Sequence, residues 1–226
     1  MAARREFLAL LENFRHGSDM AAAYLYSGMA VQHAAAKSEK LLNRLNMTPS
    51  FWWTHQAGLQ VAAYVTIGRI FDTTSKYNIN ALLDSFDANL HEFAVAALEV
   101  RKREGVSEEP EWPAEYVKKA HCPDKRDVAR LRTKVAEYRE IYDRAVKLAR
   151  HKYIAHREKR EHSVVQVLFA AGKVRELWRL VTFLCALYNA LWGQYQMAES
   201  QCLARPDTPY VRSTTRNLRD AAGLMK

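Results

Sequence analysis

The chain has 226 residues, which is enough for one sizeable domain with a substantial core. Its content of 49% hydrophobic and 11% aromatic residues excludes a disordered class of protein. Lys and Arg number 34 against 25 for Asp and Glu, and this excess favours a polyanionic partner, either nucleic acid or an anionic membrane surface. Three scattered cysteines without zinc spacing indicate a reducing compartment, and neither a metal site nor a cofactor is predicted.

The most apolar run of the sequence is too short to span a membrane. It extends from Leu180 to Trp192 and is 13 residues long, whereas a bilayer requires about 20. The N-terminal residues show no clean apolar stretch followed by a cleavage site. We therefore expect a soluble, cytoplasmic protein in which this run is a buried helix.

The first half of the chain predicts helices separated by capping residues. A short helix over residues 3–14 is expected to end near Gly17, and Ser18 then has the character of an N-cap for a helix through about residue 45. Thr48 with Pro49 begins the next helix, which continues through Asp72. Because that helix carries apolar residues on nearly all sides, we expect it to be the most buried.

The second half predicts two short helices and then two long ones. Helices are expected over residues 79–85 and 88–104, followed by a proline-rich surface connection over residues 105–123. Residues 124–150 carry apolar positions at steps of three and four, which indicate a seam packed against antiparallel neighbours. These positions are Val128, Leu131, Val135, Tyr138, Tyr142, Ala145 and Ala149.

The last long helix is predicted to run from a capping box at Ser163 and Gln166 to about residue 200. Residues 205–226 form a basic C-terminal tail. With no lasting period-2 alternation anywhere, the sequence predicts one all-α domain over residues 1–204, an antiparallel helical bundle with additional short helices. Four tryptophans are expected in its core: Trp52, Trp53, Trp178 and Trp192.

The segment from Arg150 to His156 carries the residues best suited to chemistry. Arginine is a permanent cation whose planar donors match phosphate, and histidine can transfer a proton in either direction near neutral pH. Together they could cleave a phosphodiester without a metal. The alternative interpretation is a solvated basic end of a helix, because cations are favoured near a helix C-terminus.

The spacing of Arg150 and His156 limits how they can meet. Six positions of continuous helix separate them by about 120° in azimuth and about 9 Å along the axis. A compact site therefore requires either a break between residues 150 and 163 or two copies of the segment meeting across a two-fold axis. The sequence leaves both alternatives open.

The same segment resembles the signature of the HEPN superfamily. Five residues separate Arg150 from His156, a polar His151 follows the arginine, and Ala155-His156 is similar to the pair found in the abortive-infection, AbiU-like branch. Gly68-Arg-Ile-Phe-Asp72, followed by Asn78-Ile-Asn-Ala-Leu-Leu83, resembles the earlier helix end of that branch. The resemblance covers roughly residues 18–200 and implies a HEPN-like bundle.

What the resemblance implies is a metal-independent endoribonuclease of bacterial defence or of a toxin–antitoxin system. It implies that Arg150 and His156 are catalytic and that His151 orients the phosphate. RNA is then the substrate, a homodimer the expected assembly, and an antitoxin or other regulatory protein a further partner. The alternative is a non-catalytic HEPN-like module that binds RNA, nucleotide or a partner protein. An adaptor that binds an anionic membrane through the tail is a weaker possibility, because the tail lacks the apolar face that such helices need, so no membrane partner is predicted.

Four further residues are candidates for supporting the site or binding RNA: Arg69, Asp72, Lys152 and Arg157. Asp72 allows two interpretations. It lies three positions after Arg69, so the two could form an intrahelical ion pair. Alternatively, Asp72 holds Arg150 or an imidazole in place.

Overall fold

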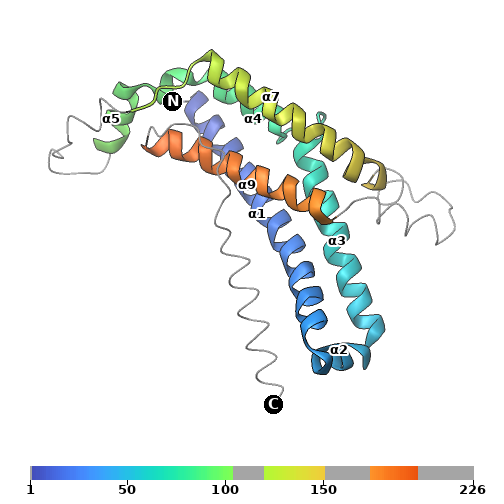
Figure 1. Cartoon of the computed structure of the whole chain (residues 1–226). Coiled ribbons are helices and arrows are strands. Elements are labelled where there is room, and N and C mark those ends of the chain that lie inside the picture. The colour runs from blue at the N-terminus through green and yellow to red at the C-terminus, as the bar shows by residue number, and fades with distance from the viewer. Residues whose placement is uncertain (1, 104–119, 151–173, 198–226) are drawn as a thin grey trace.

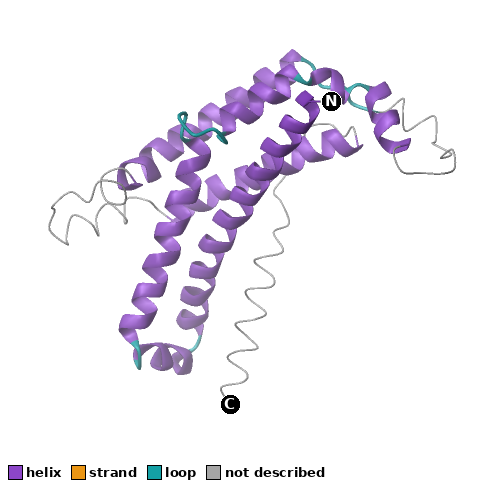
Figure 2. Ribbon diagram, turned by 180° about the vertical axis from the view of Figure 1, so that it is seen from behind, coloured by secondary structure: helices purple, strands orange, loops and turns teal. Residues whose placement is uncertain are grey.

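The computed structural model of the chain describes residues 2–103, 120–150 and 174–197. Within these ranges every regular element is helical and none is a strand, which confirms the all-α class (Figure 2). The elements are α1 (Ala2–Lys37), α2 (Glu39–Asn46), α3 (Pro49–Phe71), α4 (Ile79–Ala88), η1 (Leu90–Phe93), α5 (Val95–Arg103), α7 (Lys125–Tyr142), η2 (Asp143–Lys147) and α9 (Val174–Met197). Residues 105–119, the Ser163 capping box and the tail lie outside the described residues.

Helix α1 is continuous, so the predicted boundary at Gly17 and Ser18 is wrong. Ser18 is buried, and its hydroxyl donates a hydrogen bond to the backbone carbonyl of Phe14 at 2.8 Å instead of capping a new helix. Gly17 lies directly against the side chain of Ile70 on α3. The buried positions of α1 keep helical spacing across this point, from Phe14 to Ser18 and Ala21. Continuous packing of one face therefore outweighs the local signals for a helix end.

The first long helix ends earlier than predicted, at Lys37 instead of near residue 45. Ser38 has an extended backbone, with φ −141° and ψ 103°, and its side-chain oxygen accepts a hydrogen bond from the amide of Leu41. It is thus the N-cap of the separate short helix α2. Figure 1 shows α2 closing the far end of an antiparallel pair formed by α1 and α3.

Helix α3 begins at Pro49 and ends at Phe71, as predicted, but its burial is uneven. Its buried residues all lie in the second half, from Ala63 onward. In the first half, Phe51 is 62% exposed and Trp53 is 73% exposed. The expectations that α3 is the most buried helix and that Trp53 belongs to the core are therefore wrong. Trp192 on α9 is exposed as well.

We call residues Ser27–Ala62 the arm. It comprises the last part of α1, all of α2 and the first part of α3, and none of its residues is buried. The arm projects from the remaining helices, because α7 and α9 cross the other ends of α1 and α3 (Figure 1). Among the described residues, the helices of the arm pack on one another and on the beginning of α9.

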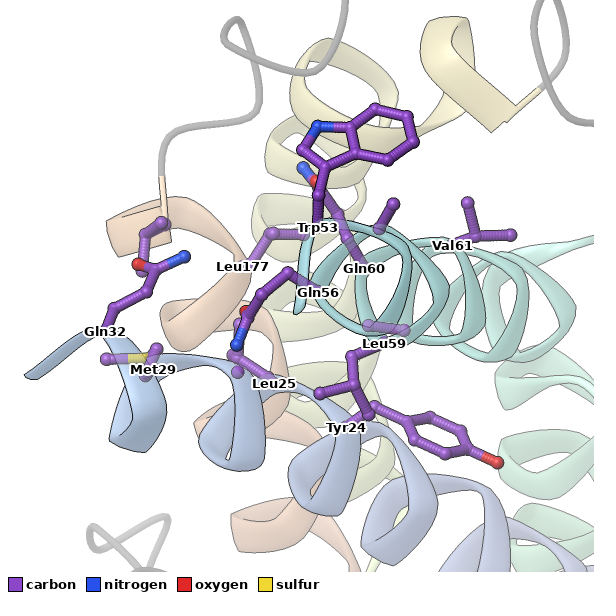
Figure 3. Close-up of a pocket in the computed structure, with 14 residues that line it drawn as sticks. Tyr24, Leu25, Met29, Gln32, Trp53, Gln56, Leu59, Gln60, Val61 and Leu177 are labelled. Carbon is purple, nitrogen blue, oxygen red and sulfur yellow. The ribbon is translucent and has the colours of Figure 1, made fainter. Parts of the chain in front are cut away.

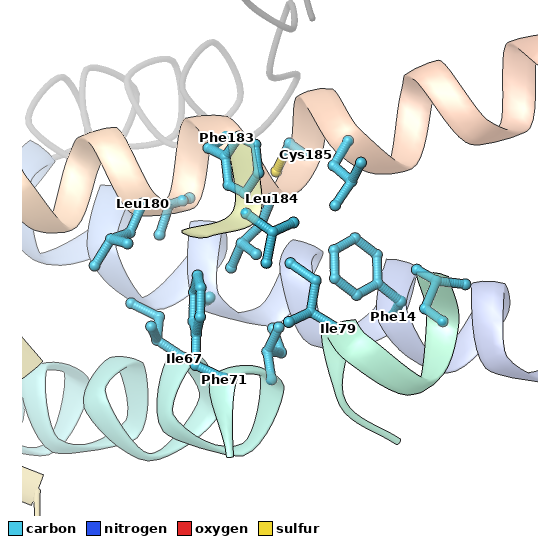
Figure 4. Close-up of a cluster of buried hydrophobic side chains, with 14 of the residues drawn as sticks. Phe14, Ile67, Phe71, Ile79, Leu180, Phe183, Leu184 and Cys185 are labelled. Carbon is cyan, nitrogen blue, oxygen red and sulfur yellow. The ribbon is translucent and has the colours of Figure 1, made fainter. Parts of the chain in front are cut away.

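The core lies at the opposite end of α3, where α1, α3, α4, α7 and α9 all contribute buried side chains; Figure 4 shows part of it. Ile67 and Phe71 of α3 pack against Leu180 and Leu184 of α9, and Phe14 of α1 joins them. The seam predicted over residues 124–150, which spans α7 and continues through η2, faces this core: six of its seven positions are buried, and Tyr138 stacks on Phe183 with ring centroids 3.9 Å apart. The steps of three and four thus predicted the buried face correctly.

Local caps fix the helices on either side of the core. Asp124 accepts hydrogen bonds from the amides of Arg126 and Asp127, and the Asp127 side chain reaches back to the amide of Asp124, so α7 starts at a capping box. At the start of α4, the side-chain oxygen of Asn78 accepts hydrogen bonds from the amides of Asn80 and Ala81. The region predicted as one helix over 88–104 consists of η1 and α5, with Ala94 in extended conformation between them. No helix among the described residues is both long and apolar enough to cross a membrane.

Candidate active site

Arg150, the first residue of one segment that resembles the family signature, meets Asp72 of the other segment in the structure. Arg150 lies just beyond the end of α7 and η2, and Asp72 is the C-cap of α3. The Nη2 atom of Arg150 donates to Oδ2 of Asp72 at 3.2 Å, across 78 positions of sequence. Each side chain is 28% exposed. The pair is therefore shielded on one side and open to solvent on the other.

Asp72 divides its two carboxylate oxygens between two partners. Oδ1 accepts hydrogen bonds from the backbone amide and the hydroxyl of Thr74, at 3.1 Å and 2.8 Å, while Oδ2 faces Arg150. The hydrogen bonds from Thr74, and secondarily Arg150, lower the pKa of Asp72 below its ordinary value. Asp72 is thus held as a carboxylate in a fixed orientation.

Gly68 provides the surface on which the Arg150 side chain lies. A Cβ atom built on Gly68 would come within 2.5 Å of Nε of Arg150 and even closer to its Cδ. Real Cβ atoms do not approach other atoms so closely, and the end of the arginine is already fixed by Asp72. Only a glycine at this position allows Arg150 to lie flat across α3.

Tyr142 is the third contact of Arg150. Burial, the largest influence, opposes the charge of Arg150, but hydrogen bonds to the Tyr142 hydroxyl and to Asp72 raise its pKa. Tyr142 is itself buried and stacks on Phe71 with ring centroids 5.0 Å apart. We call Gly68, Asp72, Tyr142 and Arg150 together the Arg150 seat. It presents a permanent cation whose position is fixed by the core.

A second arginine, which the sequence analysis missed, closes the end of α3. Arg139 donates to the backbone carbonyl of Phe71 at 2.9 Å and lies over the Phe71 ring. It satisfies one of the carbonyls that a helix end leaves without a partner. The spacing in the sequence could have predicted this role. Arg139 and Arg150 are eleven positions apart, which is about three helical turns, so both arginines are expected on the same face of a helix.

The helix leading to Arg150 widens before it reaches the seat. The segment η2 is π-helical, and such turns recur at functional sites because they re-aim the residues that follow. Buried Ala145 and Val146 keep this segment against the core. Neither composition nor spacing predicted this change of helix type.

The other candidates from the sequence are not all brought together. Arg69 is exposed on α3, and since Asp72 pairs with Arg150, the interpretation of Arg69 and Asp72 as an intrahelical pair is wrong. His151, Lys152, His156 and Arg157 lie outside the described residues, as does the predicted break between residues 150 and 163. In the parts of the chain that are described, no three His, Cys, Asp or Glu side chains gather where they could bind a metal ion.

Comparison with known proteins identifies a family for this chain. The family model for HEPN proteins described as AbiU2 matches residues 4–216, nearly the whole chain. No curated protein and no solved structure matches the chain. The matched range includes both segments of the Arg150 seat.

Proposed function

Because the chain belongs to the AbiU2 family of HEPN proteins, we propose that it is a metal-independent endoribonuclease in which Arg150 and His156 form the catalytic pair. The observation that carries this proposal is the Arg150 seat. A guanidinium fixed by Asp72, Tyr142 and the bare backbone of Gly68 is preorganised for phosphate. Preorganised cations are the groups that stabilise charge developing in a transition state.

The proposed reaction is transphosphorylation within the RNA strand. The 2′-hydroxyl attacks the adjacent phosphorus, the bond from phosphorus to the 5′-oxygen breaks, and a 2′,3′-cyclic phosphate forms. His156 accepts the proton of the 2′-hydroxyl or supplies one to the leaving 5′-oxygen. Arg150 counters the charge on the phosphorane, and His151 orients the phosphate. DNA lacks the attacking hydroxyl and is therefore no substrate.

Asp72 acts as a positioning residue in this scheme. It contacts Arg150 through Oδ2 and is oriented by Thr74 through Oδ1, so it fixes the direction of the guanidinium without touching RNA. The part of Arg150 that remains open to solvent faces the substrate. Arg69, Lys152 and Arg157 supply further positive charge for the RNA backbone.

The biological setting we propose is bacterial defence by abortive infection, or a toxin–antitoxin system, with an antitoxin or other regulatory protein as partner. The family name supports the first of these settings. We expect a partner that inhibits the active site, because an unregulated ribonuclease would damage the RNA of its own cell.

The same ion pair also favours one alternative function. Part of the charge of Arg150 is neutralised by Asp72 within the protein, as expected of a structural arginine. In that case the chain is a HEPN module that binds RNA, nucleotide or a protein without cutting. Both functions allow the chain to bind RNA, but only the first cleaves it. An experiment that measures RNA cleavage therefore distinguishes the two.

The deciding experiment is RNA cleavage in the presence of a chelator. We expect fragments with cyclic phosphate ends, and a loss of rate on the order of 10²–10⁴ in His156→Ala and of about 10²–10³ in Arg150→Ala. His91→Ala is the matched control, because His91 is an exposed histidine on η1 remote in sequence from the motif. It should cut as well as the wild type.

Two further results would contradict the proposal. A single 2′-deoxy substitution at the cleaved position should abolish cutting there, and persistent cutting would rule out attack by the 2′-hydroxyl. A requirement for Mg²⁺ would exclude the mechanism written above. RNA binding with a steep salt dependence but no cleavage of any RNA offered would instead establish the binding module.

A further inference from the structure

An exposed aromatic side chain lies in the loop that joins α3 to α4. We call residues 72–78 the α3–α4 loop, and Figure 2 shows it in teal at the ends of the two helices. Tyr77 of this loop is 46% exposed. The ammonium group of the neighbouring Lys76 lies 5.4 Å from the centroid of the Tyr77 ring. The loop therefore presents a flat aromatic ring and a cation side by side.

The α3–α4 loop is joined directly to Arg150. The carboxylate of Asp72 accepts two hydrogen bonds from Thr74 of the loop through Oδ1 and one from Arg150 through Oδ2. One side chain thus fixes both the loop and the guanidinium. A ligand held by Arg150 lies next to this loop.

Hydrogen bonds at both ends hold the loop in one conformation. The amide of Ser75 donates to the carbonyl of Asp72 at 3.2 Å, which closes a turn at the first end. At the other end, the buried side chain of Asn78 donates to the carbonyl of Ser75 and accepts from the first amides of α4. A side chain on a preorganised loop loses little conformational entropy when it binds a ligand.

The charges of the loop and of the adjoining turn of α3 are compatible with a polyanion. Asp72 is the only acidic residue of the loop, and both of its oxygens already accept hydrogen bonds within the protein. Lys76 is exposed, and Arg69 is exposed one turn before the loop. A strand of nucleic acid therefore meets cations on either side of the Asp72–Arg150 pair.

We propose that the α3–α4 loop binds the nucleotide next to the phosphate held by Arg150, with its base stacked on the ring of Tyr77 and a phosphate contacted by Lys76. The proposal rests on the proposed function, because the phosphate at Arg150 places the strand beside the loop. Stacking on an aromatic ring tolerates any base, since every base has a flat face. It requires a base that is free of its duplex, so the site accepts unpaired segments of RNA.

Trp53 provides a matched control for the loss of an exposed ring. It is 73% exposed and lies beside the hollow between α1 and α3 (Figure 3). It precedes Phe71, the last residue of α3, by 18 positions, which is about 27 Å along the helix. A strand bound at Arg150 and Tyr77 does not need this ring.

Fluorescence anisotropy of the full-length protein with a labelled single-stranded 2′-O-methyl oligoribonucleotide tests the proposal. This probe cannot be cut by the proposed reaction, because its 2′-hydroxyls are blocked, so binding is measured apart from cleavage. Tyr77→Ala should weaken binding about 5- to 150-fold, as expected when one base loses its stacking partner. Tyr77→Phe should bind nearly as tightly as the wild type, because the ring remains.

Two further measurements separate stacking from charge and from a role in the fold. Lys76→Ala should reduce the slope of log affinity against log salt by about 0.7, the value for one phosphate contact on a single strand. Tyr77→Ala should leave that slope unchanged. When the probe is annealed to its complement, Tyr77→Ala should have no effect, because the bases are stacked inside the duplex.

The proposal is overturned if the wild type does not bind the probe, if Tyr77→Ala binds it as tightly as the wild type, if Tyr77→Phe binds it as weakly as Tyr77→Ala, or if Trp53→Ala weakens binding equally. These results leave the proposed nuclease intact wherever the wild type cuts RNA. Conversely, a wild type that binds the probe through Tyr77 but cuts no RNA refutes the nuclease and retains the binding site. Circular dichroism must show unchanged helicity in all variants.

Discussion

The two halves of α3 contain similar apolar residues but have opposite surroundings. Phe71, at the end of the helix, is 1% exposed and stacks on Tyr142, whereas Phe51, at its beginning, is 62% exposed. The difference comes from the neighbours: α7, η2 and α9 cross the second half, while among the described residues the first half meets α1, α2 and the beginning of α9. An apolar face thus indicates that some part of a helix is buried. Which part is buried depends on where the other helices of the fold cross it.

The charges follow the same division. The arm carries charged residues only at its tip, whereas the end of α3 carries the carboxylate of Asp72 and binds two arginines, Arg139 of α7 and Arg150. Chemistry requires fixed polar groups, and a packed core can hold them in place. The comparison therefore separates a packed end of α3 with fixed polar groups from an exposed, apolar beginning.

The strongest test of this division is the same substitution at both ends of α3. Phe71→Ala should lower the free energy of unfolding by about 3–5 kcal/mol, because it leaves a cavity in the core. Phe51→Ala should change it by less than about 0.5 kcal/mol, since the ring is exposed. Urea unfolding measures both. Equal effects would show that the arm is packed as firmly as the core.

The next test concerns the Arg150 seat. It predicts that one substitution, Gly68→Ala, lowers the free energy of unfolding in the wild type and raises it when Arg150 is absent. Gly68→Ala should destabilise the protein by about 1–3 kcal/mol, because the new methyl group displaces Arg150. In an Arg150→Ala background the same change should stabilise it by about 0.5–1 kcal/mol, since alanine favours a helix over glycine and the obstacle is gone. A double-mutant cycle in urea gives the coupling. Destabilisation of equal size in both backgrounds would mean that Gly68 serves another neighbour.

The smallest expected effect is the pH dependence due to Asp72. Its pKa is lowered in the folded protein, so its ionised form stabilises the fold above the ordinary value of 3.8, and this contribution is lost as pH falls through the lowered pKa. Asp72→Asn should therefore cost up to about 1 kcal/mol at neutral pH. The difference from wild type should vanish in strong acid.

Arg150→Ala sharpens that measurement. The hydrogen bonds from Thr74 are the larger cause of the lowered pKa of Asp72 and do not involve Arg150. The pH dependence of stability should therefore persist in Arg150→Ala, only slightly reduced. Its complete loss would show that the ion pair, and not Thr74, determines the ionisation of Asp72.

Much of the fold was predictable because local signals decided it. Pro49 can begin a helix without losing a hydrogen bond, and α3 begins there. The steps of three and four in α7 identified the buried face because a helix repeats every 3.6 residues. By contrast, Gly17 and Ser18 carry strong local signals for a boundary, yet α1 continues through them. The contacts of this segment with the core stabilise the continuous helix by more than a break would.

The sequence by itself determined the helical class, several helix ends and the residue types suited to the site. Only the tertiary structure decided that Asp72 pairs with Arg150 and not with Arg69, because a partner 78 positions away leaves no periodic trace in the sequence. It also decided that Gly68 must be a glycine, since that need arises from a side chain of another helix. The exposure of Trp53 has the same origin: burial depends on which helices cross α3, and local sequence does not specify their paths.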